Sequence, residues 1–127
     1  MEEYKEIRQR ENEGYRRYFY DDKYSLMVWL NHKDGNITGF QIAYDKNNNE
    51  KVITYKDDEG RKVRSHRFVT GTIPYEHGSS MTSILKGNAG EVRCNVIKDI
   101  EERIKEIDIE NIKYIIDGIN SFKGKDI

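Results

Sequence analysis

Residues 31–55, NHKDGNITGFQIAYDKNNNEKVITY, decide the fold because they contain two turn-forming segments between three runs of β-forming residues. Apolar and polar residues alternate beside both turns, which is typical of antiparallel strands with one buried face. The segments KDG (33–35) and DEG (58–60) both end in glycine. Each therefore predicts a hairpin closed by a three-residue loop whose glycine is left-handed.

Loop length fixes which residues face each other across a hairpin. A loop at 33–35 places Leu30 opposite Thr38, whereas a two-residue loop would pair apolar residues with small or polar ones. A four-residue loop at 46–49 and a loop at 58–60 complete the register. The predicted apolar face is Leu26, Val28, Leu30, Phe40, Ile42, Tyr44, Ile53, Tyr55 and Val63. The predicted mixed face is Met27, Trp29, Gly39, Gln41, Ala43, Val52, Thr54, Arg64, His66 and Phe68.

The flanking segments complete a single α+β domain over residues 1–127. Helix formers predict a short N-terminal helix at 1–14, ending at glycine. Residues 24–69 form the predicted antiparallel four-stranded meander, and 70–87, rich in Gly, Ser and Thr, a long loop. Apolar residues at helical spacing in 88–124 predict two helices, whose isoleucine-rich faces should pack on the apolar sheet face.

Composition limits the classes of function. The chain has 22 Lys and Arg against 23 Asp and Glu, a formal net charge of -1. Nucleic acid is therefore an unfavoured partner, since binding it usually needs a basic excess, and single-stranded nucleic acid is a third alternative because RRYFY (16–20) interleaves arginine and aromatic residues. The longest apolar run, LMVWL (26–30), is too short to cross a bilayer, and MEEYKEIRQR (1–10) is not a secretory signal. With a single cysteine, Cys94, these features predict a cytoplasmic protein.

The mixed face holds the primary candidate binding residues. Trp29 should lie opposite Gly39, whose missing side chain would leave room for the indole. The surrounding donors and acceptors are Gln41, Thr54, Arg64 and His66. A flat aromatic group among polar groups suits a peptide or a small planar ligand. The alternative is that another part of the chain covers this face.

A second candidate lies in the turn YDKNNNE (44–50). The proposed register sets Asp45 opposite Glu50, with Lys46 beside them, and two facing carboxylates would raise one pKa. Asparagine also suits left-handed turn positions without any chemistry. The turn lacks the spacing of a calcium loop, and His32, His77 and Cys94 lack zinc-ligand spacing, so neither a metal nor a cofactor is expected.

Two functions from different classes follow. The first is a non-enzymatic module that binds a protein or peptide partner through the open sheet face, with an edge strand offering a route to a homodimer. The alternative is a small-molecule-binding domain or enzyme that uses His66, Arg64, Gln41 and the Asp45/Glu50 pair. No nucleophile stands at a recognised spacing from the histidine, and whether the protein is an enzyme stays open at this point.

Three segments resemble a family of short bacterial proteins of uncharacterised function. They are MVWLNHKDGNITGFQIAYDKNNNEKVITY (27–55), SHRFV (65–69) and MTSIL (81–85). Such proteins carry a similar tryptophan, a GFQLxYDK-like strand, a downstream glutamate and a Ser-His pair. The resemblance covers residues 18–85 and implies a bacterial, cytosolic origin but no activity. VTGTIPYEHG (69–78) departs from the acidic stretch expected after the Ser-His strand.

Overall fold

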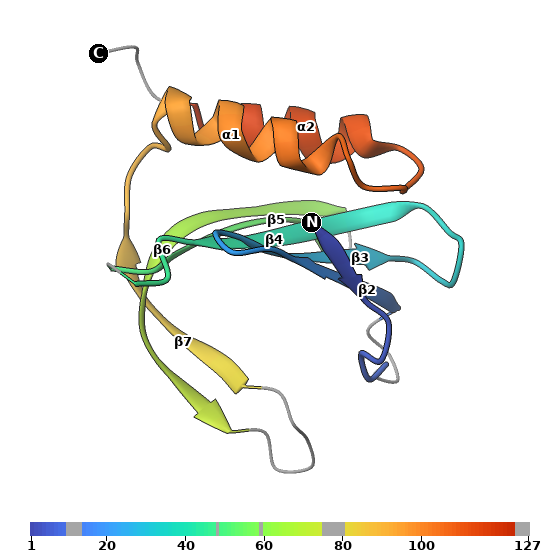
Figure 1. Ribbon diagram of the computed structural model, residues 1–127, viewed down its shortest axis with the longest axis horizontal. Coiled ribbons are helices and arrows are strands. Elements are labelled where there is room, and N and C mark those ends of the chain that lie inside the picture. Colours follow the sequence, from blue (N-terminus) through green and yellow to red (C-terminus); the bar gives the residue numbers. More distant parts are fainter. Residues whose placement is uncertain (10–13, 48, 59, 75–80, 124–127) are drawn as a thin grey trace.

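The computed structural model describes residues 1–9, 14–47, 49–58, 60–74 and 81–123. Within these ranges, one antiparallel sheet with its strands in chain order carries two C-terminal helices on one face (Figure 1). The strands are β1 (Glu2–Tyr4), β2 (Tyr15–Tyr20), β3 (Ser25–Leu30), β4 (Ile37–Tyr44), β5 (Lys51–Asp58), β6 (Arg61–Pro74) and β7 (Met81–Asn88). The helices are α1 (Cys94–Ile104) and α2 (Ile112–Asn120).

The predicted α+β fold, an antiparallel meander with two C-terminal helices, is confirmed, but the predicted number of four strands is wrong. Strands β2–β7 form a six-stranded meander, and the three-residue β1 extends it at one edge. The aromatic segment 15–20, outside the predicted meander, is the second strand. It pairs with β3 over its whole length, with Phe19 opposite Leu26.

The predicted N-terminal helix at 1–14 is also wrong. Residues 2–4 pair with β2 instead, and the Arg17 guanidinium donates to both carboxylate oxygens of Glu3, at 2.8 and 2.9 Å. Tertiary pairing thus overrides a favourable helix propensity. Gly14 does not end a helix, and its left-handed backbone (φ of 70°) lies so close to Leu30 that a Cβ would clash with the Leu30 carbonyl oxygen.

The predicted loop at 70–87 is largely two strands. Strand β6 pairs with β5 over its first part, Arg61–Phe68, and with β7 from Arg67 to Pro74. The later part of β6 and its partner β7 form a two-stranded arm that bends away from the helix layer (Figure 1). Both segments contain β-forming threonine and isoleucine beside the glycines and serines, and here the β-forming residues outweighed the turn-forming ones.

The first two hairpins match the predicted register almost throughout. Val28 faces Phe40, Trp29 faces Gly39 and Ile42 faces Ile53. The exception is the end of the first hairpin, where Leu30 faces Ile37 rather than Thr38 through a bulge.

The KDG turn itself differs from the prediction. Asp34, with φ of 60°, takes the left-handed position that was assigned to Gly35. The Asn36 amide donates to the Asn31 side-chain oxygen at 3.0 Å. A Cβ on Gly35 would lie 1.9 Å from that oxygen, so glycine is needed here for space.

The third hairpin is shifted by one residue. Asp58 pairs with Arg61, so the ladder reaches one residue further than the predicted loop at 58–60 allows, and residue 59 of that loop lies outside the described residues. Tyr55 consequently faces Arg64 instead of Val63. Because neighbouring strand residues point to opposite faces, this shift moves the β6 side chains to the other side of the sheet.

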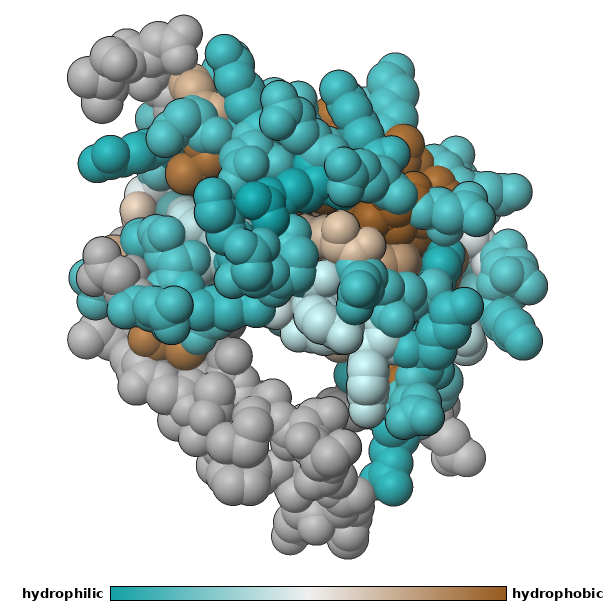
Figure 2. All heavy atoms as spheres, in the orientation of Figure 1, coloured by the Kyte–Doolittle hydropathy of each residue, from teal (hydrophilic) through white to brown (hydrophobic). Residues whose placement is uncertain are grey.

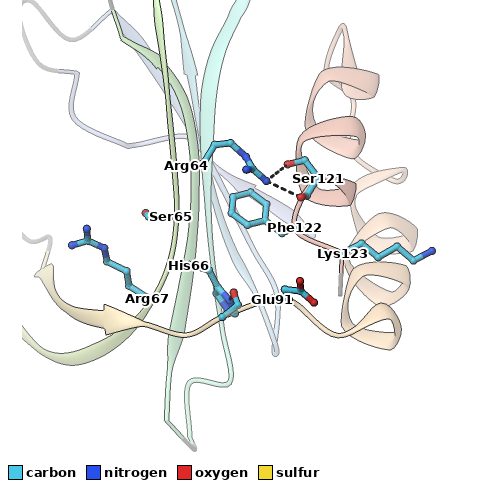
Figure 3. Close-up of a pocket in the computed structure, with 9 residues that line it drawn as sticks. Arg64, Ser65, His66, Arg67, Glu91, Ser121, Phe122 and Lys123 are labelled. Carbon is cyan, nitrogen blue, oxygen red and sulfur yellow. Dashed lines mark hydrogen bonds between the residues drawn. The ribbon is translucent and has the colours of Figure 1, made fainter. Parts of the chain in front are cut away.

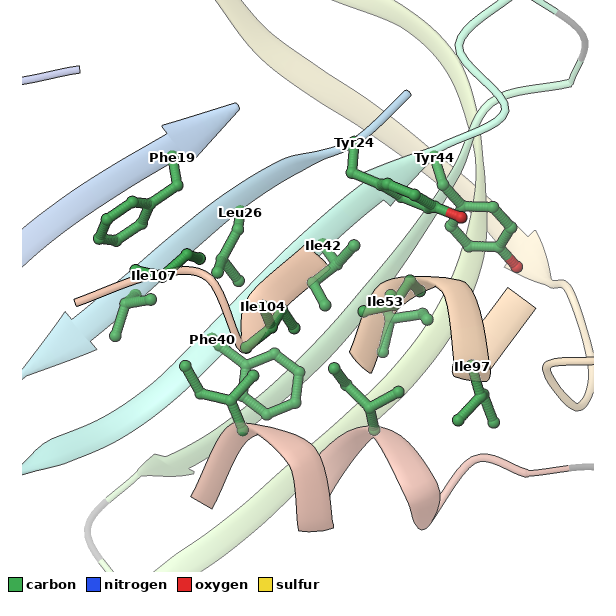
Figure 4. Packing of buried hydrophobic residues seen from close by; sticks show 14 of the residues in the cluster. Phe19, Tyr24, Leu26, Phe40, Ile42, Tyr44, Ile53, Ile97, Ile104 and Ile107 are labelled. Atoms are coloured by element: carbon green, nitrogen blue, oxygen red, sulfur yellow. The ribbon is translucent and has the colours of Figure 1, made fainter. Parts of the chain in front are cut away.

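The core lies between the sheet and the helices (Figure 4). Phe40 stacks on Tyr55 with ring centroids 5.6 Å apart, and a Cβ on Gly118 of α2 would lie 2.6 Å from the Phe40 ring. The fully buried core side chains are Leu26, Val28, Phe40, Ile42, Ile53, Val92, Ile97, Ile100, Ile104, Ile115 and Ile119. Most of these were predicted, including the isoleucines of both helices.

Helix α2 is attached to the sheet near both of its ends. The Tyr114 hydroxyl donates to the Thr38 carbonyl at 3.2 Å, and Asp57 lies at the same distance. Beyond the other end, the Arg64 guanidinium donates to the carbonyl and the hydroxyl of Ser121 at 2.7 and 3.0 Å.

Candidate functional site

The sheet face opposite the helices is the strongest candidate for a binding surface. Figure 2 shows that the outside of the helix layer is mostly hydrophilic, as expected of a solvated surface. The opposite sheet face instead carries the three large apolar side chains that are most exposed in the described chain: Tyr4 (43%), Tyr20 (39%) and Val63 (41%). We call this face the open face. By strand alternation it includes Tyr4, Tyr18, Tyr20, Met27, Trp29, Gln41, Thr54, Lys56 and Val63.

Three predicted site residues lie together on the open face. The Gln41 side-chain amide donates to the Thr54 hydroxyl at 3.0 Å. Trp29 is half-buried, and the Lys56 ammonium lies 5.0 Å from the centre of its ring. Such a cation–π contact leaves an ammonium next to a flat apolar surface. A peptide carboxylate and an apolar side chain could therefore both bind here.

The role predicted for Gly39 needs correction. It does lie opposite Trp29, but a Cβ on this residue would lie 2.8 Å from the Lys56 Cα and 2.8 Å from the Tyr55 carbonyl oxygen. Glycine is thus required for the close approach of β5, rather than to leave room for the indole.

Arg64 does not belong to the open face, contrary to prediction. The shifted third hairpin turns it toward the helices, where its guanidinium binds Ser121 and lies 4.7 Å from the centre of the Phe122 ring. These contacts fasten the C-terminal end of α2 to the sheet. Phe68 changes face for the same reason, and the Lys51 ammonium lies over its ring.

His66 also lies on the helix side and is only 4% exposed. Its Nδ1 is 2.7 Å from the Gly90 carbonyl oxygen, and its Nε2 contacts the Tyr44 hydroxyl. Because a carbonyl only accepts, Nδ1 carries the proton and Nε2 accepts from the hydroxyl. Burial lowers the pKa of His66, and burial also raises the pKa of Tyr44. The pair is a neutral hydrogen-bonded link between β4, β6 and the segment before α1.

A pocket of about 680 Å³ lies beside this link, between β6 and the C-terminal end of α2 (Figure 3). Arg64, Glu91 and Lys123 contribute charged groups to its lining. In Figure 3 the Arg67 and Ser65 side chains lie on the other side of the strand from the helix, and Lys123 points outward. The charged groups therefore do not converge on a common point, and the arrangement defines no ligand.

The interactions that the structure shows for Asp45 and Glu50 are with other residues rather than with each other. The Asp45 carboxylate instead accepts from the Lys51 ammonium at 2.8 Å, and the backbone of Asp45 is left-handed (φ of 55°). The Glu50 carbonyl accepts from the Val69 amide. Lys46 reaches the other way and donates to the Ser25 hydroxyl, at the rim of the open face.

The sequence analysis missed the tyrosines of the open face. Tyr18 and Tyr20 stack with ring centroids 6.3 Å apart, and Tyr4 faces Tyr18 across the β1–β2 pair. The signal was available, because in YRRYFY (15–20) Tyr18 and Tyr20 alternate with the buried Phe19. Reading that segment as a strand would have placed both rings beside Met27 and Trp29.

A network of charged groups that involves Asp99 and Arg103 of α1 is structural. The Arg103 guanidinium of α1 binds Asp21 at 2.7 Å and Asp99 at 3.3 Å. The Tyr24 hydroxyl donates to Asp99 at 2.6 Å, and burial together with that carboxylate raises the pKa of Tyr24. The network fastens α1 to the turn between β2 and β3.

One edge of the sheet is partly covered by a side chain. The Gln9 amide donates to the Arg16 carbonyl and accepts from the Arg16 amide, each at 2.8 Å. It thereby takes the place of a strand residue where β1 does not reach. An edge-to-edge homodimer stays a prediction, and this part of the β2 edge is occupied within the monomer.

Among the residues that the structure describes, no cluster of three or more His, Cys, Asp or Glu side chains could hold a metal ion. Neither of the helices in the described ranges is long and apolar enough to span a membrane. Comparisons with protein-family models, curated proteins and solved structures find no match for the chain.

Proposed function

We propose that this protein is a non-enzymatic interaction module that binds a protein or peptide partner through the open face. The observation that carries the proposal is the placement of its exposed apolar side chains. Tyr4, Tyr20 and Val63 share the face that the helices do not cover. Tyrosine, tryptophan and methionine are enriched where proteins bind one another, and Trp29 and Met27 lie on the same face.

The alternative, a small-molecule site or an enzyme, has less support. It requires Gln41, Arg64 and His66 to act together. Gln41 lies on the open face, whereas Arg64 and His66 lie on the helix side of the sheet. His66 already makes hydrogen bonds through both ring nitrogens. The interaction module requires only groups that lie on one side of the sheet.

The test is selection of peptides from a displayed random library, followed by titration of each selected peptide. Trp29 is the only tryptophan of the chain, so its fluorescence reports binding directly. We expect Trp29→Ala and the double change Tyr18→Ala/Tyr20→Ala to weaken binding by about tenfold or more, because aromatic groups dominate interface energies. The tryptophan variant is titrated with labelled peptide.

Glu102→Ala, an exposed change on α1, is the matched control and should bind as the wild type does. Acrylamide quenching of Trp29 should be intermediate in the free protein and weaker with peptide bound. If no peptide is enriched, or if the open-face variants bind as tightly as the control, the proposal is wrong.

A further inference from the structure

The open face differs from the rest of the molecule in charge. Strand alternation directs Arg16, Lys56 and Arg67 to this face, and Glu2 lies on it as well, whereas Arg61 stands opposite Asp58 in the ladder. The Lys46 ammonium adds a cation at the rim through Ser25. The chain as a whole has a net charge of -1, whereas the described cations of this face outnumber its described acidic side chain. Such a field attracts anionic partners and repels cationic ones.

Acidic residues lie instead on the helix side. The segment from Glu91 to Asp117 contains eight acidic residues against five basic ones: Glu91, Asp99, Glu101, Glu102, Glu106, Asp108, Glu110 and Asp117, against Arg93, Lys98, Arg103, Lys105 and Lys113. The helix layer between residues 91 and 117 therefore has a net charge of -3 (five basic minus eight acidic residues), and a negatively charged partner would favour the open face over this layer.

The aromatic groups favour a peptide over a nucleic acid. Binding of single-stranded nucleic acid depends on ring faces on which bases stack. Here the Lys56 ammonium lies over the Trp29 ring, and Tyr18 and Tyr20 stack on each other with 23° between their planes. Carboxylates need no open ring face. They can pair with Lys56 and Arg67 while neighbouring apolar side chains contact Met27 and the edges of the rings.

We infer that the partner of the open face is an acidic peptide segment in which aspartate or glutamate residues are interspersed with apolar ones. This inference rests on the proposed function and specifies the partner's chemistry. The cations supply attraction and selectivity, the aromatic and aliphatic side chains supply buried area, and the Gln41–Thr54 pair offers hydrogen bonds to a peptide backbone.

The test uses three fluorescein-labelled probes of equal length, and their anisotropy is measured with the wild-type protein. The first is a peptide in which glutamate alternates with leucine, the second has lysine in place of each glutamate, and the third is an oligothymidylate. We expect the glutamate peptide to bind, the lysine peptide to bind at least about tenfold more weakly, and binding of the first to weaken as salt screens the charges.

Charge reversal gives the sharper measurement. Lys56→Glu combined with Arg67→Glu should weaken binding of the glutamate peptide by about tenfold or more and strengthen binding of the lysine peptide. Lys113→Glu/Lys98→Glu, at two exposed helix positions, changes the net charge equally and should leave both affinities near the wild-type values. Thermal unfolding verifies that each variant is folded.

The outcomes separate the two proposals. Equal or tighter binding of the lysine peptide, or equal effects of the two double variants, overturns the acidic partner. Library peptides that bind through Trp29 while the glutamate peptide does not bind also overturn it, but leave the proposed function standing. If the oligothymidylate binds more tightly than the glutamate peptide and requires Trp29, the face binds nucleic acid and both proposals fail.

Discussion

Replacing Phe40 with alanine should lower the free energy of unfolding by about 3–5 kcal/mol, the usual cost of removing a buried phenylalanine. The ring is fully buried, stacks on Tyr55 and fills the space beneath Gly118 of α2. Its loss leaves a cavity between the layers. Urea denaturation followed by circular dichroism measures the change. Gln41→Ala, the next residue on the opposite face, is the control and should cost about 1 kcal/mol.

Gly118→Ala tests the same contact from the helix. In the wild type the new methyl group would lie 2.6 and 2.8 Å from two carbon atoms of the Phe40 ring, so we expect a cost of about 1–3 kcal/mol from overpacking. In the Phe40→Ala background the ring is absent, and the better helix propensity of alanine should make the same change neutral or stabilising. Additive effects of the two changes would contradict this packing.

His66→Ala should cost about 2–4 kcal/mol, because it leaves the Tyr44 hydroxyl and the Gly90 carbonyl without the imidazole that joins them. The matched control is His32→Ala, since His32 is exposed in the first hairpin turn. Urea denaturation at pH 7.5 measures both. A cost for His66→Ala no greater than that of the control would contradict the structural role of this link.

The same histidine makes stability depend on pH. Its pKa in the folded protein is lowered by burial from the ordinary value of 6.5, so below that value the unfolded chain binds more protons than the folded one. The contribution of neutral His66 to the free energy of unfolding is complete above the pKa of histidine in the unfolded chain. It is lost as pH falls toward the lower pKa of the folded protein, by at most about 1.4 kcal/mol per pH unit. Between pH 7.5 and 5.5 the wild type should therefore lose more stability than His66→Ala.

The first two hairpins could be predicted from sequence because several signals agreed there. Turn residues bracket segments in which Leu26, Val28, Phe40, Ile42 and Ile53 fit one buried face, and a shift would have buried Gln41 or exposed Phe40. The segment RKVRSHRFV (61–69) gives no such agreement, since Val63 and Val69 alternate in one phase and Phe68 in the other. Burial of apolar residues therefore did not distinguish between the two possible registers of this strand. In the observed register, Arg64 and His66 make hydrogen bonds on the helix side.

The candidate site was predicted in part for the same reason. Trp29, Gln41 and Thr54 lie in the well-determined hairpins and share a face as expected, whereas Arg64 and His66 follow the shifted turn and lie on the other face. The N-terminal strand could not be read from propensity, because GluGluTyr (2–4) favours a helix in isolation and becomes a strand only beside β2 and Arg17.

The attachment of α2 near both ends has a consequence for motion. With Tyr114 bound to β4 at one end and Ser121 bound to Arg64 at the other, the helix cannot swing outward without breaking contacts on two strands. Amide hydrogens of α2 and of central β4 should therefore exchange with solvent at similar slow rates, through opening of the whole domain. The helix layer therefore keeps the sheet rigid. When a partner binds, the side chains of the open face adjust rather than the backbone.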